Sequence, residues 1–151
     1  LAEALCRRGV SVVVLDNLNT GAIANLAWRR PDDALEFVQG DVADPDTVRR
    51  AVAGCDWVFH EAALVSVPKS VAQPVESHRD NITGTLHVLV AARDAGVKRL
   101  VFASSSAIYG DSEAALKPET QPPSPLTPYA LQKYTAERYG QLFHSLTASK
   151  R

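Results

Sequence analysis

Short runs of mainly apolar residues occur four times along the chain, and the first, at residues 12–15, shows no polar alternation; longer segments with helical patterning separate them. Uninterrupted apolar runs of this kind are buried on both faces, as the strands of a parallel sheet are. The predicted strands cover residues 12–15, 35–38, 57–60 and 100–103. Several of them lead directly into an acidic or small polar residue, so polar groups are expected to gather where the strands end.

The helical segments carry recognisable start and stop residues. The predicted helices cover residues 45–53, about 74–95 and 128–142, with Asp44 and Thr127 as N-caps and Gly54 and Gly96 as stops. Helix and strand therefore alternate, which predicts an α/β fold with a doubly wound, Rossmann-like parallel sheet. In such folds ligands bind beyond the carboxyl ends of the strands. The proline-rich piece 117–128 is interpreted as an ordered loop over that edge.

Composition narrows the class of protein. The 151 residues are 46% hydrophobic with a formal net charge of -1, which is typical of one soluble globular domain. No block of like charge points to nucleic acid or to a membrane surface, so a small-molecule partner is expected. Cys6 and Cys55 are far apart, form no disulfide or metal pattern, and are interpreted as core thiols in helices. A reducing compartment, the cytoplasm, is expected.

The two ends of the chain predict a piece of a longer protein. There is no methionine, and the first nine residues, LAEALCRRG, resemble the second half of an amphipathic helix. Residues 1–151 are therefore interpreted as an incomplete dinucleotide-binding domain. Its first strand and glycine-rich phosphate loop would precede Leu1, because counting back from Asp16 places that loop there.

Asp16 ends a predicted strand and opens the stretch DNLNTG. A carboxylate at this place accepts hydrogen bonds from the adenosine ribose of a dinucleotide and repels a 2'-phosphate, which favours NAD over NADP. The alternative is turn chemistry, since Asp and Asn side chains bind their own backbone. Asp41, in the stretch GDV, has the same two interpretations.

Tyr129 and Lys133 are one helical turn apart, so both can reach one ligand. A tyrosine is a poor base at neutral pH, and a neighbouring ammonium group favours its phenolate form. The pair could then move a proton, or it could simply be the solvated first turn of a surface helix, because this spacing also arises by chance.

Other polar residues follow two of the predicted strands. Ser104, Ser105 and Ser106 can bind a substrate hydroxyl or begin a turn. His60 is interpreted as a packed or hydrogen-bonded histidine. Glu61 is either a general base or a solvated loop carboxylate.

Six stretches in order, LDNLNTG, GDV, HEAA, DNITGT, SSSAIYG and TPYALQK, resemble the extended short-chain dehydrogenase/reductase family. The resemblance is to its NAD-dependent epimerase/dehydratase branch, and within it to UDP-glucose and UDP-N-acetylglucosamine 4-epimerases. It implies Ser105, Tyr129 and Lys133 as catalytic residues. It also implies that Asp16, Asn17, Asn19, Thr20, Asp41, Val42, Ala62, Ala63, Asn81, Tyr129 and Lys133 bind NAD, and that Ser66, Ser105, Ser106 and Tyr129 bind substrate.

The resemblance implies reversible epimerisation at C4 of a UDP-hexose by an NAD-dependent enzyme. Dehydratases of the branch carry Asp-Glu where this chain has Ser106 and Ala107, so dehydration is disfavoured. The alternatives are a dehydrogenase, reductase or decarboxylase of the same branch, a non-catalytic NAD-binding module, or a phosphate-receiving signalling domain. No metal is expected.

The resemblance also implies a homodimer, because dimers of this family pack through the helices near Leu86 and Ala136. The missing C-terminal part would bind the nucleotide sugar. The fragment alone is therefore expected to be inactive.

Overall fold

The computed structural model describes residues 1–111 and 116–148. In chain order the elements are α1 (Ala2–Cys6), β1 (Val12–Asp16), η1 (Ile23–Leu26), β2 (Leu35–Gln39), α2 (Pro45–Val52), β3 (Trp57–His60), α3 (Val67–Ala72), α4 (Pro74–His78), η2 (Arg79–Thr83), α5 (Gly84–Asp94), β4 (Arg99–Phe102), η3 (Ser106–Tyr109) and α6 (Pro128–Ala148). The elements η1 and η3 are 3₁₀ helices, and η2 is a π-helical turn.

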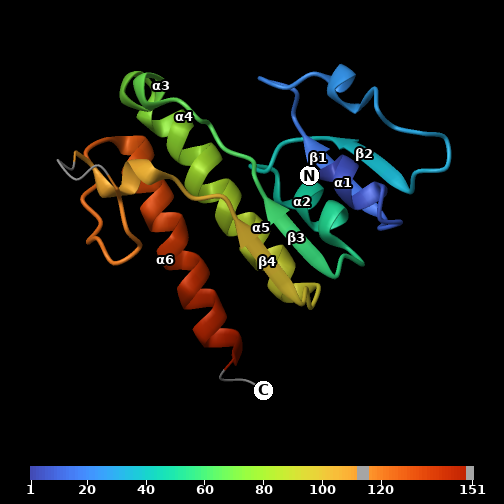
Figure 1. The fold of residues 1–151 in the computed structure, drawn as a ribbon. Coiled ribbons are helices and arrows are strands. Elements are labelled where there is room, and N and C mark those ends of the chain that lie inside the picture. Colours follow the sequence, from blue (N-terminus) through green and yellow to red (C-terminus); the bar gives the residue numbers. More distant parts are fainter. Residues whose placement is uncertain (112–115, 149–151) are drawn as a thin grey trace.

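The strands form two parallel pairs. β1 pairs with β2 so that Asp16 lies opposite Gln39, and β3 pairs with β4 so that His60 lies opposite Phe102. In Figure 1 the strands of both pairs run in the same direction, which brings their carboxyl ends toward one edge. The predicted parallel α/β architecture is confirmed.

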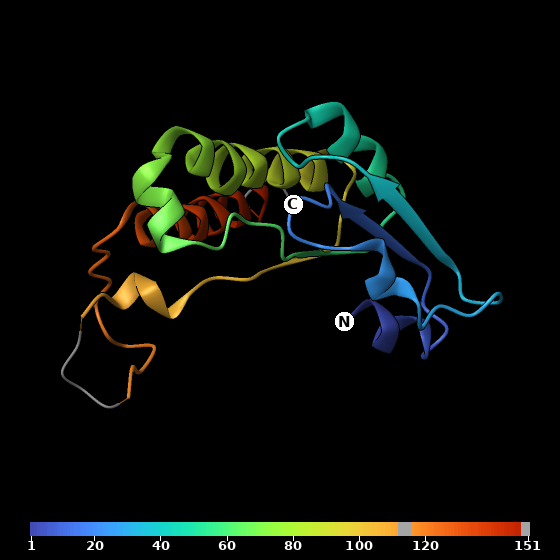
Figure 2. The same cartoon turned by 90° about the horizontal axis from the view of Figure 1, so that it is seen from above.

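Helices cover the strands on both faces. Figure 2 shows α2, α4, α5 and α6 on one side of the strands and α1 on the other. Val48 and Val52 of α2 pack with Val88 and Ala91 of α5 to form the core, and strand residues pack against this cluster. Among the described residues, no helix is both long and apolar enough to cross a membrane.

The predicted helix boundaries follow from capping. Asp44 Oδ1 accepts a hydrogen bond from the Asp46 backbone N–H at 3.0 Å, and Thr127 Oγ1 accepts one from the Ala130 N–H at 3.2 Å. Both predicted N-caps are confirmed. Gly96 adopts a left-handed φ of 69° just beyond α5, as a helix stop requires.

The predicted helix over residues 74–95 is a continuous helical path, but it contains the π turn η2 between α4 and α5. A π turn inserts an extra residue into the helix and is frequent at functional sites. Hydrophobic periodicity gives no sign of it. Gly84, directly after the turn, lets the helix approach the GDV stretch closely, because a β-carbon there would lie 2.7 Å from Val42 Cγ2.

The short helix α3 has no counterpart among the predicted elements, and two sequence expectations need correction. β4 begins and ends one residue earlier than expected, at Arg99 and Phe102. Cys6 is buried in α1 as expected, but Cys55 lies after α2 and is only half-buried, because the helix has already ended before Gly54.

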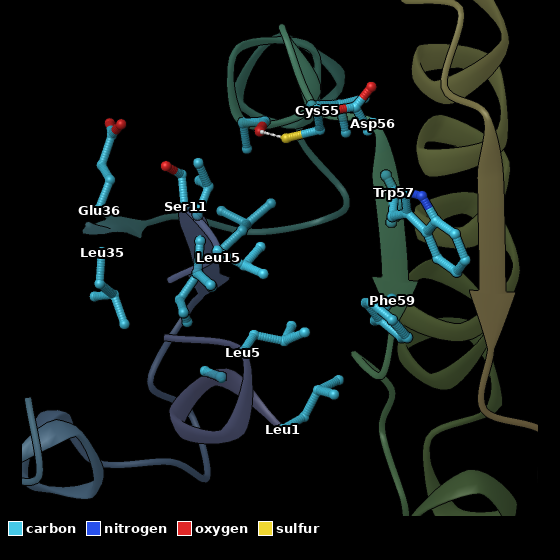
Figure 3. A pocket seen from close by; sticks show the side chains of 18 of the residues that line it. Leu1, Leu5, Ser11, Leu15, Leu35, Glu36, Cys55, Asp56, Trp57 and Phe59 are labelled. Atoms are coloured by element: carbon cyan, nitrogen blue, oxygen red, sulfur yellow. Dashed lines mark hydrogen bonds between the residues drawn. The ribbon is translucent and has the colours of Figure 1, made fainter. Parts of the chain in front are cut away.

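A cleft of about 1410 Å³ separates the two strand pairs. In Figure 3, Leu15 of β1 and Phe59 of β3 lie on its opposite walls, and Leu1 and Leu5 lie near α1 at one end. Trp57 on the β3 side is 54% exposed. The cleft therefore presents apolar strand surface from both pairs.

Candidate functional site

Tyr129 and Lys133 lie on one buried face of α6. Pro128 starts the helix, and the spacing of four places both side chains on the same side. Only 6% of Tyr129 and 3% of Lys133 is exposed. The alternative of a solvated first turn of a surface helix is therefore wrong.

The Lys133 ammonium group lies at the carboxyl end of β4. Its Nζ donates a hydrogen bond to the Ala103 carbonyl at 2.8 Å and lies 4.7 Å from the centre of the Phe102 ring. Burial lowers the pKa of Lys133 below its ordinary value, and the Glu61 carboxylate opposes that shift. The helix that carries Tyr129 is thereby joined to the strand that leads into the serines.

Ser105 begins η3 at this strand end. Its Oγ accepts a hydrogen bond from the Ala107 N–H at 3.2 Å, so its own O–H proton can still be donated to a ligand. Ser106 is exposed beside it. Both interpretations of the serines, turn and ligand donor, are thus compatible with the structure.

The end of the SSSAIYG stretch is held by the proline-rich loop. The Ser124 N–H donates to the Ile108 carbonyl at 2.8 Å. Gly110 has a φ of 62°, and a β-carbon there would lie 2.2 Å from the Ser124 carbonyl oxygen. Only glycine fits this close approach, which fastens the loop at Ser124 to the end of the SSSAIYG stretch.

Asp16 ends β1 with an exposed side chain. Its Oδ1 accepts from the Leu18 N–H at 2.7 Å, and Asn17 Oδ1 accepts from the Asn19 N–H at 3.0 Å. These are the turn bonds that the alternative interpretation predicted. The exposed carboxylate lies beside Gly21, where a β-carbon would be in contact with both of its oxygens at 3.4 Å. Thr20, between them in sequence, is exposed.

Asp41 is bound within the chain at both carboxylate oxygens. Oδ1 accepts from the Ala43 N–H at 2.8 Å, and Oδ2 lies 3.1 Å from the Arg79 guanidinium. Val42 is half-buried beneath Gly84. The Asp41 side chain therefore stabilises the turn at GDV and, through its ion pair with Arg79, connects that turn to the long helical segment.

His60 is confirmed as a packed histidine. Its Nε2 lies 2.9 Å from Thr85 Oγ1, and 3% of the residue is exposed. Burial, with a smaller contribution from the Lys133 charge, lowers the pKa of His60 from 6.5 to about 4. The next residue, Glu61, is exposed, as its loop interpretation predicted.

The segment after β3 carries Ala62 and Ala63, which are both half-buried. It is fixed at Leu64, whose N–H donates to Asn81 Oδ1 at 2.8 Å. Ser66 then caps α3, with its Oγ accepting from the Lys69 N–H at 3.2 Å. At Ala62 and Ala63 this segment therefore presents only its backbone and small side chains.

Asn81 is 2% exposed and lies in the π turn. Its Nδ2 donates to Gln132 Oε1 at 2.9 Å, and Ser77 Oγ donates to the same oxygen at 2.6 Å. The resemblance implied that Asn81 holds either the loop or a ribose. In this structure its side chain holds the loop at Leu64.

Sequence reasoning missed three buried polar residues around the Tyr129 helix: Ser70, Ser77 and Gln132. Ser70 Oγ accepts from the Tyr129 backbone N–H at 3.1 Å. No sequence signal marks them in advance, because Ser70 lies in α3 and Ser77 in the separate helix α4, and Gln132 is an ordinary polar residue of α6. Among the described residues, no His, Cys, Asp and Glu group could hold a metal ion.

The fold and the site define an α/β protein of the dinucleotide-binding class. A family model, the NAD dependent epimerase/dehydratase family, matches residues 1–148, and the chain belongs to this family. The expected family resemblance is confirmed.

Individual relatives include the UDP-glucose 4-epimerase of Streptomyces lividans, 39% identical over 140 residues that cover 91% of this chain and 41% of that protein. The structure of the Thermus thermophilus UDP-glucose 4-epimerase in complex with NAD is 39% identical, with a TM-score of 0.87 over 97% of this chain and 47% of that one. The Methanobrevibacter ruminantium UDP-N-acetylglucosamine 4-epimerase, solved with UDP-N-acetylmuramic acid, is 35% identical with a TM-score of 0.87 over 95% of this chain and 46% of that one. The chain thus spans less than half the length of these relatives.

Proposed function

We propose that this chain is the NAD-binding part of an enzyme that interconverts UDP-hexoses by epimerisation at C4. The observation that carries the proposal is the buried Tyr129–Lys133 pair, with the lysine bound at 2.8 Å to the strand end that leads into Ser105. The relatives named above, UDP-glucose and UDP-N-acetylglucosamine 4-epimerases, support the choice of reaction.

The residues present fit a nicotinamide dinucleotide. The exposed Asp16 carboxylate accepts hydrogen bonds from ribose hydroxyls, and the missing β-carbon of Gly21 leaves room beside both carboxylate oxygens. Asn17, Asn19 and Thr20 would contribute from the same turn, and Asp41 and Val42 from the next strand end. Ala62 and Ala63 would pass beneath the cofactor, while Asn81 would hold that segment. Lys133 would hold the nicotinamide ribose.

Bound NAD would supply a reversible hydride acceptor for C4 of the sugar. Tyr129, as a phenolate next to the Lys133 ammonium, would remove the proton of the 4-hydroxyl group. Ser105 would donate a hydrogen bond to the same oxygen, with Ser106 and Ser66 contacting the sugar nearby. After the keto sugar has rotated to present its other face, C4 would regain the hydride and Tyr129 would return the proton to the C4 oxygen, so that neither cofactor nor protein is changed overall.

The direct test is substitution of Tyr129 in the full-length protein. Tyr129→Phe should lower the turnover of UDP-glucose to UDP-galactose by about 10²- to 10⁴-fold while NAD stays bound. Full turnover in this variant would contradict the mechanism. A steady build-up of NADH in the parent protein would instead indicate net oxidation of the nucleotide sugar.

The cleft between β1 and β3 supports a domain proposal. Two parallel pairs with the same direction present apolar strand surface to one another across it. A further parallel strand in this position would join the pairs into one sheet, and a glycine-rich loop at its end would meet the pyrophosphate. A C-terminal part would complete the nucleotide-sugar pocket.

We further propose a cytoplasmic homodimer that packs through α5 and α6. Ala136 is 2% exposed and is buried within the chain, so it cannot itself reach a partner. Leu131 and Leu142 of the same helix are 53% and 51% exposed and are better placed for that role. Sedimentation of the full-length protein and of a Leu142→Glu variant tests this: a dimer in the parent and a monomer in the variant are expected.

A further inference from the structure

We propose that a buried polar clamp, formed by Ser70, Ser77, Asn81 and Gln132, positions Tyr129 and Lys133 for catalysis, with Gln132 as its central positioning residue. This inference rests on the proposed function. None of the four side chains is more than 6% exposed. The clamp joins α3, α4 and the π turn to the first two turns of α6.

Gln132 is the member of the clamp that lies in α6. It lies three residues after Tyr129, which places it about one turn further along the same side of the helix, and it is buried as Tyr129 and Lys133 are. Its Oε1 accepts two hydrogen bonds, from Ser77 Oγ at 2.6 Å and from Asn81 Nδ2 at 2.9 Å. One acceptor atom therefore fixes the second turn of α6 against two positions of the facing helix.

The π turn places Asn81 between two segments. On one side its amide reaches Gln132, and on the other its Oδ1 accepts from the Leu64 N–H at 2.8 Å. The segment at Leu64 follows the half-buried Ala62 and Ala63. A single side chain thus connects the helix of Tyr129 and Lys133 to the segment proposed to pass beneath the cofactor.

Ser70 fixes the first turn of the same helix. Its Oγ accepts from the Tyr129 N–H at 3.1 Å and its hydroxyl donates to the Val67 carbonyl at 2.8 Å. With 0% of the residue exposed, water cannot replace it without a rearrangement. Two successive turns of α6 are therefore tied to the α3–α4 region, at the backbone N–H of Tyr129 and at the side chain of Gln132.

Removal of the acceptor at Gln132 would take from the buried Ser77 hydroxyl the acceptor that it uses and would leave Asn81 Nδ2 with only its longer bonds, to the Leu64 carbonyl and Ser77 Oγ at 3.3 Å. An unsatisfied buried donor has a free-energy cost, and without these ties α6 can shift relative to the segment at Leu64. A displacement near 1 Å is enough to lower turnover by about 100-fold when the reacting groups stay present but are misplaced. The expected signature is a loss in kcat with little change in KM, since neither the nucleotide-sugar contacts nor the charge of the site changes.

The test uses Gln132→Met in the full-length, NAD-loaded protein, because methionine keeps the length of the side chain and removes the acceptor. We expect kcat to fall by about 10- to 100-fold, with KM within about twofold and bound NAD unchanged. Gln141→Met, on the exposed part of the same helix, is the matched control and should keep the parent kcat. In the 151-residue chain itself, amide hydrogen exchange at Leu64 should become faster in Gln132→Met.

Ser77→Ala provides a milder second variant and a coupling test. Since Ser77 acts through Gln132, the double variant should be about as slow as Gln132→Met alone. A parent-like kcat in Gln132→Met, or strictly additive losses in the double variant, would overturn the clamp. If Gln132→Met does not fold, a parent-like kcat in Ser77→Ala overturns it. An inactive parent protein would instead refute the proposed function, and Leu64 exchange would still report on the clamp.

Discussion

The residues at the end of β1 and those around α6 are held in opposite ways. Asp16 and Asn17 bind backbone N–H groups two residues further along, in an exposed turn. Tyr129 and Lys133 are buried, and their bonds reach 59 and 30 residues back in the chain, to Ser70 and Ala103. The first region is built from local contacts and the second from long-range ones.

Because of this difference, the two regions should not tolerate substitutions equally well. A local Asx turn re-forms after a change elsewhere, because all its partners lie within a few residues. A buried polar contact between distant segments depends on the packing of every helix between them, and leaving one partner unsatisfied has a free-energy cost. Substitutions should therefore have large effects around α6 and small ones at the end of β1.

The largest effect is expected at Lys133. Lys133→Met removes the buried ammonium that lies one helical turn after Tyr129, and it should lower turnover of the full-length protein by about 10²- to 10⁴-fold. Steady-state kinetics with UDP-glucose measures it. Lys98→Met, at an exposed ion pair, is the control and should stay at the parent rate. A variant with lowered stability but parent turnover would show that Lys133 acts only in packing.

His60 should make the buried region sensitive to acid. Its pKa is lowered to about 4 in the folded chain, so the unfolded chain binds more protons between pH 6.5 and 4. The stabilisation is complete above pH 6.5 and is lost as the pH falls toward 4, by a total of about 3 kcal/mol.

Urea unfolding at pH 7.5 and pH 4.5 measures this loss in the parent chain and in His60→Gln, where the decrease should be smaller. His144→Gln, which changes an exposed histidine, serves as the control. An identical pH dependence in the parent and in His60→Gln would show that this imidazole does not cause the acid sensitivity.

A smaller effect, on the order of 2 kcal/mol, is expected for Gly110→Ala. Its φ of 62° and the closeness of the Ser124 carbonyl leave no room for a methyl group. Gly140→Ala in α6 is the matched control, since no atom lies within 4 Å of the added carbon. That control should gain about 0.5 to 1 kcal/mol of stability in urea unfolding, as alanine favours a helix. Equal losses in both would contradict the steric argument.

The same distinction explains how far the sequence could predict the molecule. The strand pattern, the Asp44 and Thr127 caps and the Gly96 stop are local, and the structure agrees with them. The π turn is invisible to periodicity, because one inserted residue leaves the apolar pattern on both sides intact. Ser77 and Gln132 are ordinary polar residues in the sequence, and only the fold brings them together across 55 positions.

The smallest effect is expected at Asp16, where the comparison predicts a change in ligand choice without a change in fold. Asp16→Ser keeps a hydroxyl oxygen that can accept from the Leu18 N–H, so the free energy of unfolding should change by no more than about 0.5 kcal/mol. Loss of the carboxylate should weaken NAD binding to the full-length protein by about tenfold and remove the repulsion of a 2'-phosphate, which narrows the preference over NADP. Isothermal titration with both dinucleotides measures this, with the exposed Asp32→Ser as control. If Asp16→Ser keeps the parent preference for NAD over NADP, the only role of Asp16 is to stabilise its turn. Other residues of that turn would then have to hold the ribose.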